Sequence, residues 1–281
     1  MQIFKNQKEL QLFLEKAVQN NKTIGFVPTM GALHEGHLSL IEASKKENDF
    51  TLCSIFVNPT QFNNKEDLNN YPKDINSDIV ILKNVGCDLT FIPSLEELYP
   101  KNPNLKIPFY ELGYLDTILE AAYRPGHFQG VAHIMTLFLE LIKPHRLYMG
   151  QKDYQQCMVV QKLLEKLHFK TEFCMIPIKR EDDGLAMSSR NVRLNEFERS
   201  KASLIYQCLI SIKAKKGMQE FSVMQKESKE LMENKGLKVE YIQLADAQTL
   251  EVLEDFDLTK PMVVLIAAHL GNVRLIDNIK I

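Results

Sequence analysis

The stretch PTMGALHEGHLSL, residues 28–40, decides the fold of this chain. It joins an apolar strand, residues 23–27, to a helical pattern that begins near His37. Because proline cannot donate a hydrogen bond within a central strand, we expect the strand to end before Pro28. Unpaired N–H groups and the positive dipole end of the helix favour an anion at its start, and the glycines of the loop allow close approach of the backbone. The stretch therefore predicts a phosphate site after this strand.

Two histidines, His34 and His37, lie three residues apart in this loop and would add hydrogen-bond donors to the phosphate site. Two other interpretations remain open. One ring could cap the helix while the other packs against the core, or the pair could bind zinc. HEGH lacks the His-Glu-x-x-His spacing of zinc proteases and the chain has no Cys-x-x-Cys pair, so the phosphate interpretation is favoured.

The composition is that of an ordinary globular protein. The 281 residues are 45% hydrophobic and 25% charged, and the formal net charge is −2. This balance, without a Lys/Arg-rich stripe, argues against nucleic acid as a partner. No run reaches the ~18 apolar residues of a membrane span, and no signal peptide is recognisable. The five widely spaced cysteines suggest reduced thiols, so we expect a cytoplasmic protein with no membrane partner.

Helical and strand patterns alternate along the first 177 residues. Strands are predicted at residues 23–27, 50–57, 87–92, 146–149 and 171–176. Helices are predicted at residues 10–18, 37–46, 74–85, 115–122, 131–142 and 154–167. An irregular proline-rich segment, residues 93–108, interrupts this order. Strands that alternate with helical crossovers form parallel sheets, so we expect an α/β fold with a Rossmann-like doubly wound parallel sheet.

The pattern changes after Pro177. The segment KREDDGLAMSSRN, residues 179–191, shows no apolar period and is predicted to be a loop. Helices at 195–215 and 221–234 follow, and then strands at 239–245, 262–270 and 273–279. We therefore divide the chain into a Rossmann-like substrate-binding domain, residues 1–177, and a smaller C-terminal α+β lid domain, residues 178–281.

Polar clusters follow the predicted strands, at the edge where parallel sheets bind ligands. FVNPTQF offers the amides of Asn58 and Gln61, which suit a ligand with hydroxyl and carboxylate groups. MGQKDYQQ places Lys152 at a helix entrance, where an ammonium group suits phosphate, and the adjacent Asp153 is a candidate magnesium ligand. A simple Asn-Pro turn and a simple helix cap remain alternatives for these two clusters.

Two further clusters carry polar or charged groups. In MSSRN, Ser188 and Ser189 followed by the guanidinium of Arg190 would form a mobile phosphate clamp. An exposed turn with a helix cap is the alternative. RPGHFQGV, residues 124–131, on its own indicates only a loop before a helix.

These motifs resemble those of the pantothenate synthetase family, also called pantoate–beta-alanine ligases. The family belongs to the HIGH-motif nucleotidyltransferases, and HEGH would be the HIGH equivalent. FVNPTQF, RPGHFQGV, GQKDYQQ and MSSRN follow in the family's order, so the resemblance covers nearly the whole chain. It implies ATP-dependent condensation of (R)-pantoate with beta-alanine through a pantoyl adenylate. It also implies a homodimer and a requirement for Mg²⁺.

The resemblance also implies residue roles. We expect the negative charge that develops during adenylate formation to be stabilised by six residues: His34, His37, Lys152, Ser188, Ser189 and Arg190. The further ATP-binding residues are Met30, Gly31, Ala32, Leu33, Glu35, Gly36, Gly150, Gln151, Asp153, Lys179 and Met187. The residues expected to contact pantoate or beta-alanine are Asn58, Gln61, Arg124, His127 and Gln156. The expected magnesium ligands are Asp153 and Asp78, although this chain has Ser77 where some relatives have a second aspartate.

Two other functions remain open. A nucleotidyltransferase acting on a phosphorylated acceptor would leave AMP or CMP joined to its product, whereas the ligase releases free AMP and forms an amide. A non-catalytic nucleotide-binding or RNA-associated protein would bind without releasing pyrophosphate. It should have a basic surface, which the charge of the chain does not favour.

Overall fold

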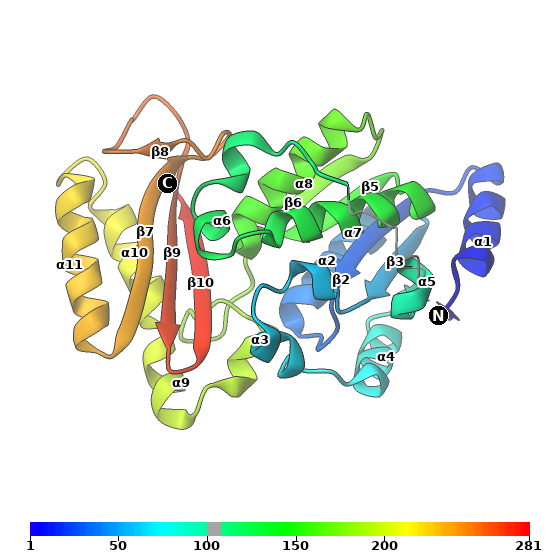
Figure 1. Ribbon diagram of the computed structural model, residues 1–281, viewed down its shortest axis with the longest axis horizontal. Helices are drawn as coiled ribbons and strands as arrows, with labels where there is room; N and C mark the ends of the chain where they lie inside the picture. The colour runs from blue at the N-terminus through cyan, green and yellow to red at the C-terminus, as the bar shows by residue number, and fades with distance from the viewer. Residues whose placement is uncertain (100–107) are drawn as a thin grey trace. The chain divides into compact units, whose positions relative to one another are not determined.

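A computed structural model describes residues 1–99 and 108–281 of the chain (Figure 1). The chain divides into two compact units. The first comprises Met1–Gly150 and Gln156–Ile176, and the second comprises Gln151–Gln155 and Pro177–Ile281. Residues 151–155 therefore group with the second unit, whereas the sequence pattern places them in the first domain.

Among the described residues, the first unit is built around a six-stranded sheet in which all neighbouring strands are parallel. In spatial order its strands are β1 Gln2–Phe4, β4 Leu89–Phe91, β3 Phe50–Ile55, β2 Ile24–Thr29, β5 Arg146–Gly150 and β6 Glu172–Ile176. After β2, the strands β3 and β4 are added on one side of β2, and β5 and β6 are then added on its other side. The predicted doubly wound sheet is confirmed, and the carboxyl ends of the paired strands β2 and β5 lie at its switch point.

The end of β2 differs from the prediction. The strand continues through Pro28 to Thr29, so the expected stop before the proline is wrong. Pro28 is in register with Ser54 of β3, whereas the register with β5 covers only Gly25 and Phe26. The missing N–H is tolerated because Pro28 lies beyond the part of β2 that pairs on both sides.

Helices cover both faces of this sheet. The helices that begin in the first 154 residues are α1 Gln7–Gln19, α2 Glu35–Glu47, α3 Lys65–Asn69, α4 Ile75–Asn84, α5 Leu95–Leu98, α6 Glu120–Tyr123, α7 His127–Ile142 and α8 Tyr154–Lys166. Short 3-10 segments are η1 Pro59–Gln61, η2 Gly113–Asp116 and η3 Gln151–Asp153. Ile41 of α2 shares a core with Val27 of β2. The neighbouring Phe26 instead meets Phe138 of α7, with 5.5 Å between ring centroids, so alternate residues of β2 face opposite cores.

Two predictions in this unit need correction, and one strand is not predicted at all. The predicted helix at residues 115–122 is two short pieces, η2 and α6, because Leu119 has φ +47°, outside the helical region. The predicted irregular segment at 93–108 contains α5, and its residues 100–107 lie outside the described residues. No sequence pattern indicates β1, because three residues are too few to establish a period.

The second unit packs helices on an antiparallel sheet, and all its residues are described. Its elements after Pro177 are η4 Ser189–Arg193, α9 Glu196–Ala202, α10 Leu204–Ala214, α11 Phe221–Asn234, β7 Leu237–Asp246, β8 Val252–Leu253, β9 Met262–Leu270 and β10 Val273–Lys280. The four strands lie in the order β10-β9-β7-β8. Figure 1 shows α10 and α11 alongside this sheet, and Leu209 and Met224 share a core with Val264 and Ile266 of β9.

The predicted α+β character of this part of the chain is confirmed. The predicted helix at 195–215 is interrupted at Ser203, which separates α9 from α10. β8, with two residues, is too short to be predicted. In the described parts of both units, no helix has the length and apolar character needed to cross a membrane.

Candidate functional site

The loop between β2 and α2 has a backbone shape that most residues do not tolerate. Gly31 has φ +80° and Ala32 has φ +50°, which are left-handed conformations. A Cβ atom on Gly31 would lie 2.7 Å from Oδ2 of Asp78. The loop therefore depends on glycine at position 31 to turn the chain from the strand into the helix.

Asp78, from α4, holds this loop in place. Its Oδ2 accepts a hydrogen bond from Ala32 N at 2.9 Å, and its Oδ1 accepts one from Leu33 N at 2.8 Å. Burial raises the pKa of the Asp78 carboxyl above its usual value, and the two backbone donors partly counteract this effect. The residue is 2% exposed and both oxygens are used within the protein. Its role as a magnesium ligand stays a prediction that these contacts do not favour.

His34 and His37 form a reciprocal cap at the start of α2. His34 Nδ1 accepts a hydrogen bond from Gly36 N at 3.1 Å, and His37 Nδ1 accepts one from His34 N at 3.3 Å. The two ring centroids are 4.1 Å apart. Because each Nδ1 accepts, each neutral ring carries its proton on Nε2, and these N–H groups are the donors suited to a phosphate.

The cap and phosphate interpretations of this histidine pair are therefore compatible. The zinc interpretation gains no support, because the described residues contain no group of three or more His, Cys, Asp or Glu side chains that could hold a metal ion.

Asn58 is a structural part of the second cluster. It is 1% exposed, and its Nδ2 donates to Gln61 Oε1 at 3.0 Å and to Gly130 O at 3.1 Å. Its Oδ1 accepts from the hydroxyls of Tyr99 and Thr60, each at 2.9 Å. The amide is used within the protein, so Asn58 holds η1 and the structure does not support its predicted contact with a substrate.

Gln61 links three of the predicted motifs. Its Nε2 lies 3.3 Å from Sδ of Met30, in the loop after β2. Its main-chain oxygen accepts a hydrogen bond from Nδ1 of His127 at 2.8 Å. His127 is 5% exposed, so it supports the main chain of Gln61. The half-buried amide of Gln61 is therefore held beside the predicted phosphate loop.

Other predicted residues of the first unit lie at element ends. Arg124 follows α6, and its Nη1 is 3.7 Å from the carboxylate of Glu120. Gln156 is half-buried near the start of α8, whereas Gln155 is only 2% exposed. Of these two glutamines, Gln156 is the more accessible to a ligand. Gly150 is the last residue of β5, at the switch point of the sheet.

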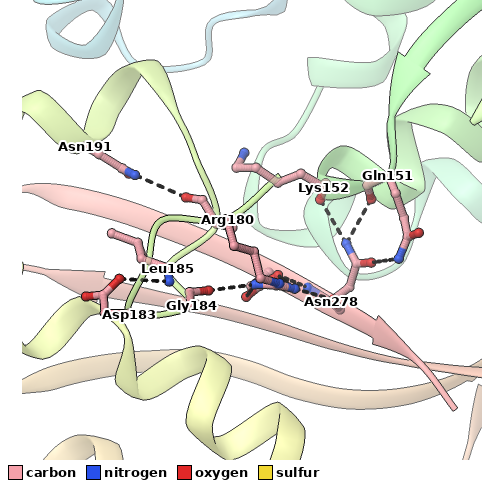
Figure 2. A network of polar contacts seen from close by, with 10 residues as sticks. Gln151, Lys152, Arg180, Asp183, Gly184, Leu185, Asn191 and Asn278 are labelled. Carbon is pink, nitrogen blue, oxygen red and sulfur yellow. Dashed lines mark hydrogen bonds and ion pairs between the residues drawn. The ribbon is translucent and has the colours of Figure 1, made fainter. Parts of the chain in front are cut away.

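Lys152 and Asp153 lie in η3, which belongs to the second unit. The side-chain amide of Asn278, in β10, donates to the main-chain oxygens of Gln151 and Lys152 at 2.9 and 3.0 Å. Figure 2 shows the side chain of Lys152 leading away from this contact. Its Nζ is 3.6 Å from Oδ1 of Asp153, in an ion pair whose side chains are 19% and 48% exposed.

The predicted loop at residues 179–191 begins as a closed hairpin. Met187 N donates to Lys179 O at 3.0 Å, and Glu181 N donates to Leu185 O at 2.9 Å. The exposed side chain of Lys179 is not needed for this pairing, which uses its main chain. The hairpin gives residues 179–187 a defined shape that the polar sequence does not indicate.

The MSSRN cluster follows this hairpin. Ser188 Oγ accepts a hydrogen bond from Arg190 N at 3.3 Å and caps η4, as the alternative interpretation predicts. Asn191 Nδ2 donates to Ala186 O at 3.1 Å and ties the cluster to the hairpin (Figure 2). Ser189 and Arg190 are half-buried. These two hydrogen bonds hold the backbone of the segment, and its function as a phosphate clamp stays a prediction.

Arg180 anchors the hairpin, although no motif predicts its role. It donates to both carboxylate oxygens of Asp277 at 2.6 and 3.0 Å and to Gly184 O at 3.0 Å. Its guanidinium carbon lies 3.9 Å from the centroid of the Tyr206 ring. The signal in the sequence is the adjacent polar pair Asp277 and Asn278 within an apolar strand. Neighbours in a strand face opposite sides, and both of these side chains are buried, so each needs a hydrogen-bond partner within the protein.

The chain matches the family model of pantoate-beta-alanine ligase over residues 2–280. It is 43% identical over 277 residues to the pantothenate synthetase of Cytophaga hutchinsonii, and the match covers 98% of this chain and 97% of that protein. The pantothenate synthetase structure from Thermus thermophilus has a TM-score of 0.91 and 37% identity, and the match covers 99% of each chain.

The structure of pantoate-beta-alanine ligase from Francisella tularensis, complexed with beta-gamma ATP and beta-alanine, has a TM-score of 0.82 and 36% identity. That match covers 99% of this chain and 97% of the other. The family model and these relatives match the chain over nearly its full length. The protein belongs to the pantoate-beta-alanine ligase family.

Proposed function

We propose that this chain carries out its ligase reaction, the ATP-dependent condensation of (R)-pantoate with beta-alanine, through a pantoyl adenylate. In the first step a carboxylate oxygen of pantoate bonds to the α-phosphorus of ATP, and the bond to pyrophosphate breaks. In the second step the amine of beta-alanine bonds to the acyl carbon, loses a proton and releases AMP. The observation that carries this proposal is the histidine pair at the start of α2, whose ring centroids are 4.1 Å apart, in a chain that matches the family from residue 2 to 280.

The first step concentrates negative charge on the phosphorus and on the leaving pyrophosphate, so preorganised donors are what it needs. The donors that we propose are the Nε2–H groups of His34 and His37. To these we add the ammonium of Lys152, the hydroxyls of Ser188 and Ser189 and the guanidinium of Arg190. Electrostatic stabilisation, rather than proton donation, is the role we propose for His37, because phosphoryl chemistry on ATP requires charge neutralisation more than protonation.

The substrates would be bound by the motifs that the resemblance identifies. The Francisella tularensis structure holds beta-gamma ATP and beta-alanine, which supports both as substrates of this chain. We propose that ATP contacts residues 30–37, 150–153 and 187–190 and the main chain of Lys179. For pantoate or beta-alanine we propose Gln61, Gln156 and Arg124, with His127 supporting Gln61.

Magnesium fits this site at Asp153. A magnesium ion that accompanies ATP takes one or two protein carboxylates and completes its shell with phosphate oxygens and water. The side chain of Asp153 is 48% exposed and can reach such an ion, whereas Asp78 is buried and holds the loop. When bound, the ion would neutralise part of the phosphate charge.

We also propose that the enzyme is a cytoplasmic homodimer, as the family resemblance implies. The five cysteines are free thiols, which is typical of a reducing compartment. Light scattering in solution should give about twice the chain mass of 32.4 kDa.

Product analysis tests the proposed reaction. The protein is incubated with ATP, Mg²⁺ and pantoate, with and without beta-alanine. We expect pantoate-dependent exchange of pyrophosphate into ATP without the amine, and free AMP plus an amide when the amine is present. A nucleotide joined to the product would indicate the nucleotidyltransferase alternative, and binding without pyrophosphate exchange would indicate the non-catalytic one.

Replacing the buried carboxylate of Asp78 should disturb the phosphate loop. In Asp78→Asn an amide offers one acceptor oxygen to two backbone N–H groups, and its NH₂ group faces the second donor. We expect the rate of pyrophosphate exchange at limiting ATP to fall about tenfold or more.

Asp74→Asn is the matched control for this substitution. It removes the same charge at the start of the same helix, but asparagine can still cap Ser77 N. Equal kinetics in the two variants would contradict the role of Asp78 in shaping the loop.

A further inference from the structure

We propose that Asn278 is a positioning residue that aligns Lys152 for adenylate formation. The proposal rests on the role of Lys152 given above. Asn278 does not itself need to touch a substrate, because its amide acts on the main chain that carries the lysine.

The amide of Asn278 is matched to the segment it holds. An asparagine side chain offers two N–H donors and one acceptor oxygen. Its Nδ2 donates to the oxygens of Gln151 and Lys152, while its Oδ1 accepts from Nε2 of Gln151 at 3.0 Å. The residue is 2% exposed, so these bonds are shielded from water. A side chain of different shape or polarity cannot reproduce this set.

The support behind Asn278 is also fixed. Its main chain lies in β10, in register with Leu265 of β9. Its N–H donates to Asp277 Oδ1 at 2.7 Å, and its main-chain oxygen accepts from Nη2 of Arg180 at 3.3 Å. Figure 2 shows this network from the Arg180 hairpin to Gln151 and Lys152. Lys152 is thus joined by hydrogen bonds to the hairpin that precedes the proposed phosphate clamp.

A second contact ties the same segment to the second unit. Tyr154 donates from its hydroxyl to Ala247 O at 2.6 Å. Lys152 closely follows Gly150, the last residue of β5, yet residues 151–155 group with the second unit. The ammonium of a lysine lies at the end of a four-carbon stem that starts from the main chain. The position of the main chain therefore limits where the ammonium can act. Asn278 sets that position.

The experiment compares Asn278→Ala, Lys152→Ala and the double variant in the full chain. The readout is pantoate-dependent pyrophosphate exchange with saturating ATP. We expect Asn278→Ala to lower the exchange rate about 10- to 100-fold, because a small displacement of a catalytic group has effects of this size. In the Lys152→Ala background the same change should add less than about twofold, because residues that act as a unit are not additive.

The outcomes separate this inference from the proposed function. If Lys152→Ala leaves exchange unchanged, the proposed role of Lys152 fails. If Lys152→Ala is impaired but Asn278→Ala exchanges at the normal rate, the positioning role fails. If the two effects multiply fully in the double variant, Asn278 acts independently of Lys152 and the inference is overturned.

Asn234→Ala, at the exposed end of α11, is the control for losing an asparagine from the second unit and should exchange at the normal rate. If Asn278→Ala does not fold, Gln151→Leu removes the side-chain bond to Asn278 and leaves the two bonds from Asn278 to the main chain, and saturating ATP limits any effect of this change on ATP binding. We then expect a decrease of about 2- to 10-fold that disappears in the Lys152→Ala background. A decrease that persists in that background would overturn the inference.

Discussion

His37→Asn is expected to lower pantoate-dependent pyrophosphate exchange by about 100-fold or more, which is typical for the loss of one preorganised donor to a developing negative charge. The Nδ1 atom of His37 accepts from His34 N, and the side-chain oxygen of asparagine stands at the same distance from the backbone. The cap can therefore persist while the Nε2–H donor is removed. The thermal unfolding midpoint should stay close to that of the unmodified protein.

His37→Gln is the matched comparison. The glutamine amide reaches further than asparagine and can place an N–H near the position of Nε2, so we expect it to recover part of the lost rate. Equal activity of His37→Asn and the unmodified protein would show that His37 serves only as a cap. Equal loss in both variants, with unchanged stability, would indicate that the imidazole ring itself is required.

Gly130→Ala should reduce both stability and the use of pantoate. A Cβ atom on Gly130 would overlap the main-chain oxygen of Thr60 and lie 2.7 Å from Gln61 N. These are backbone atoms, so η1 or α7 must move, and we expect a loss of about 1–3 kcal/mol in the free energy of unfolding. The movement would also displace Gln61, so the KM for pantoate should rise.

Urea unfolding and initial-rate kinetics measure these two effects. Gly150→Ala is the control for stability, because a Cβ atom there meets no atom within 4 Å. If Gly130→Ala unfolds at the same urea concentration as the unmodified protein, the close approach of α7 to η1 does not constrain the site.

The parts of the fold that the sequence predicts are those with long regular patterns. Residues 50–57 form a mostly apolar run, and β3 lies within it at the centre of the sheet. The edge strand β1 is paired only with β4, and its three residues carry too little pattern to be recognised. At Pro28 a local rule predicts the end of the strand too early. The rule does not state how far the neighbouring strand β5 extends, and β5 does not pair with Pro28.

The candidate site divides in the same way. Local motifs predict His34, Gln61 and Lys152, since the chemistry of each is visible in a few neighbouring residues. The support of these residues comes from far along the chain, and local patterns do not contain it. Asp78 bonds to a loop about 45 residues before it, and Arg180 bonds to Asp277, 97 residues later.

The path of the chain through residues 151–155 limits how this enzyme can be recombined. A gene fusion that takes residues 1–177 from one relative and the remainder from another cuts no helix or strand, because β6 ends at Ile176 and η4 begins at Ser189. It nevertheless inherits Gln151 and Lys152 from one parent and Asn278 from the other. A junction at residue 177 therefore separates residues that bond to each other, although it lies between the two parts of the fold. Chimeras should be chosen so that Gln151, Lys152 and Asn278 match.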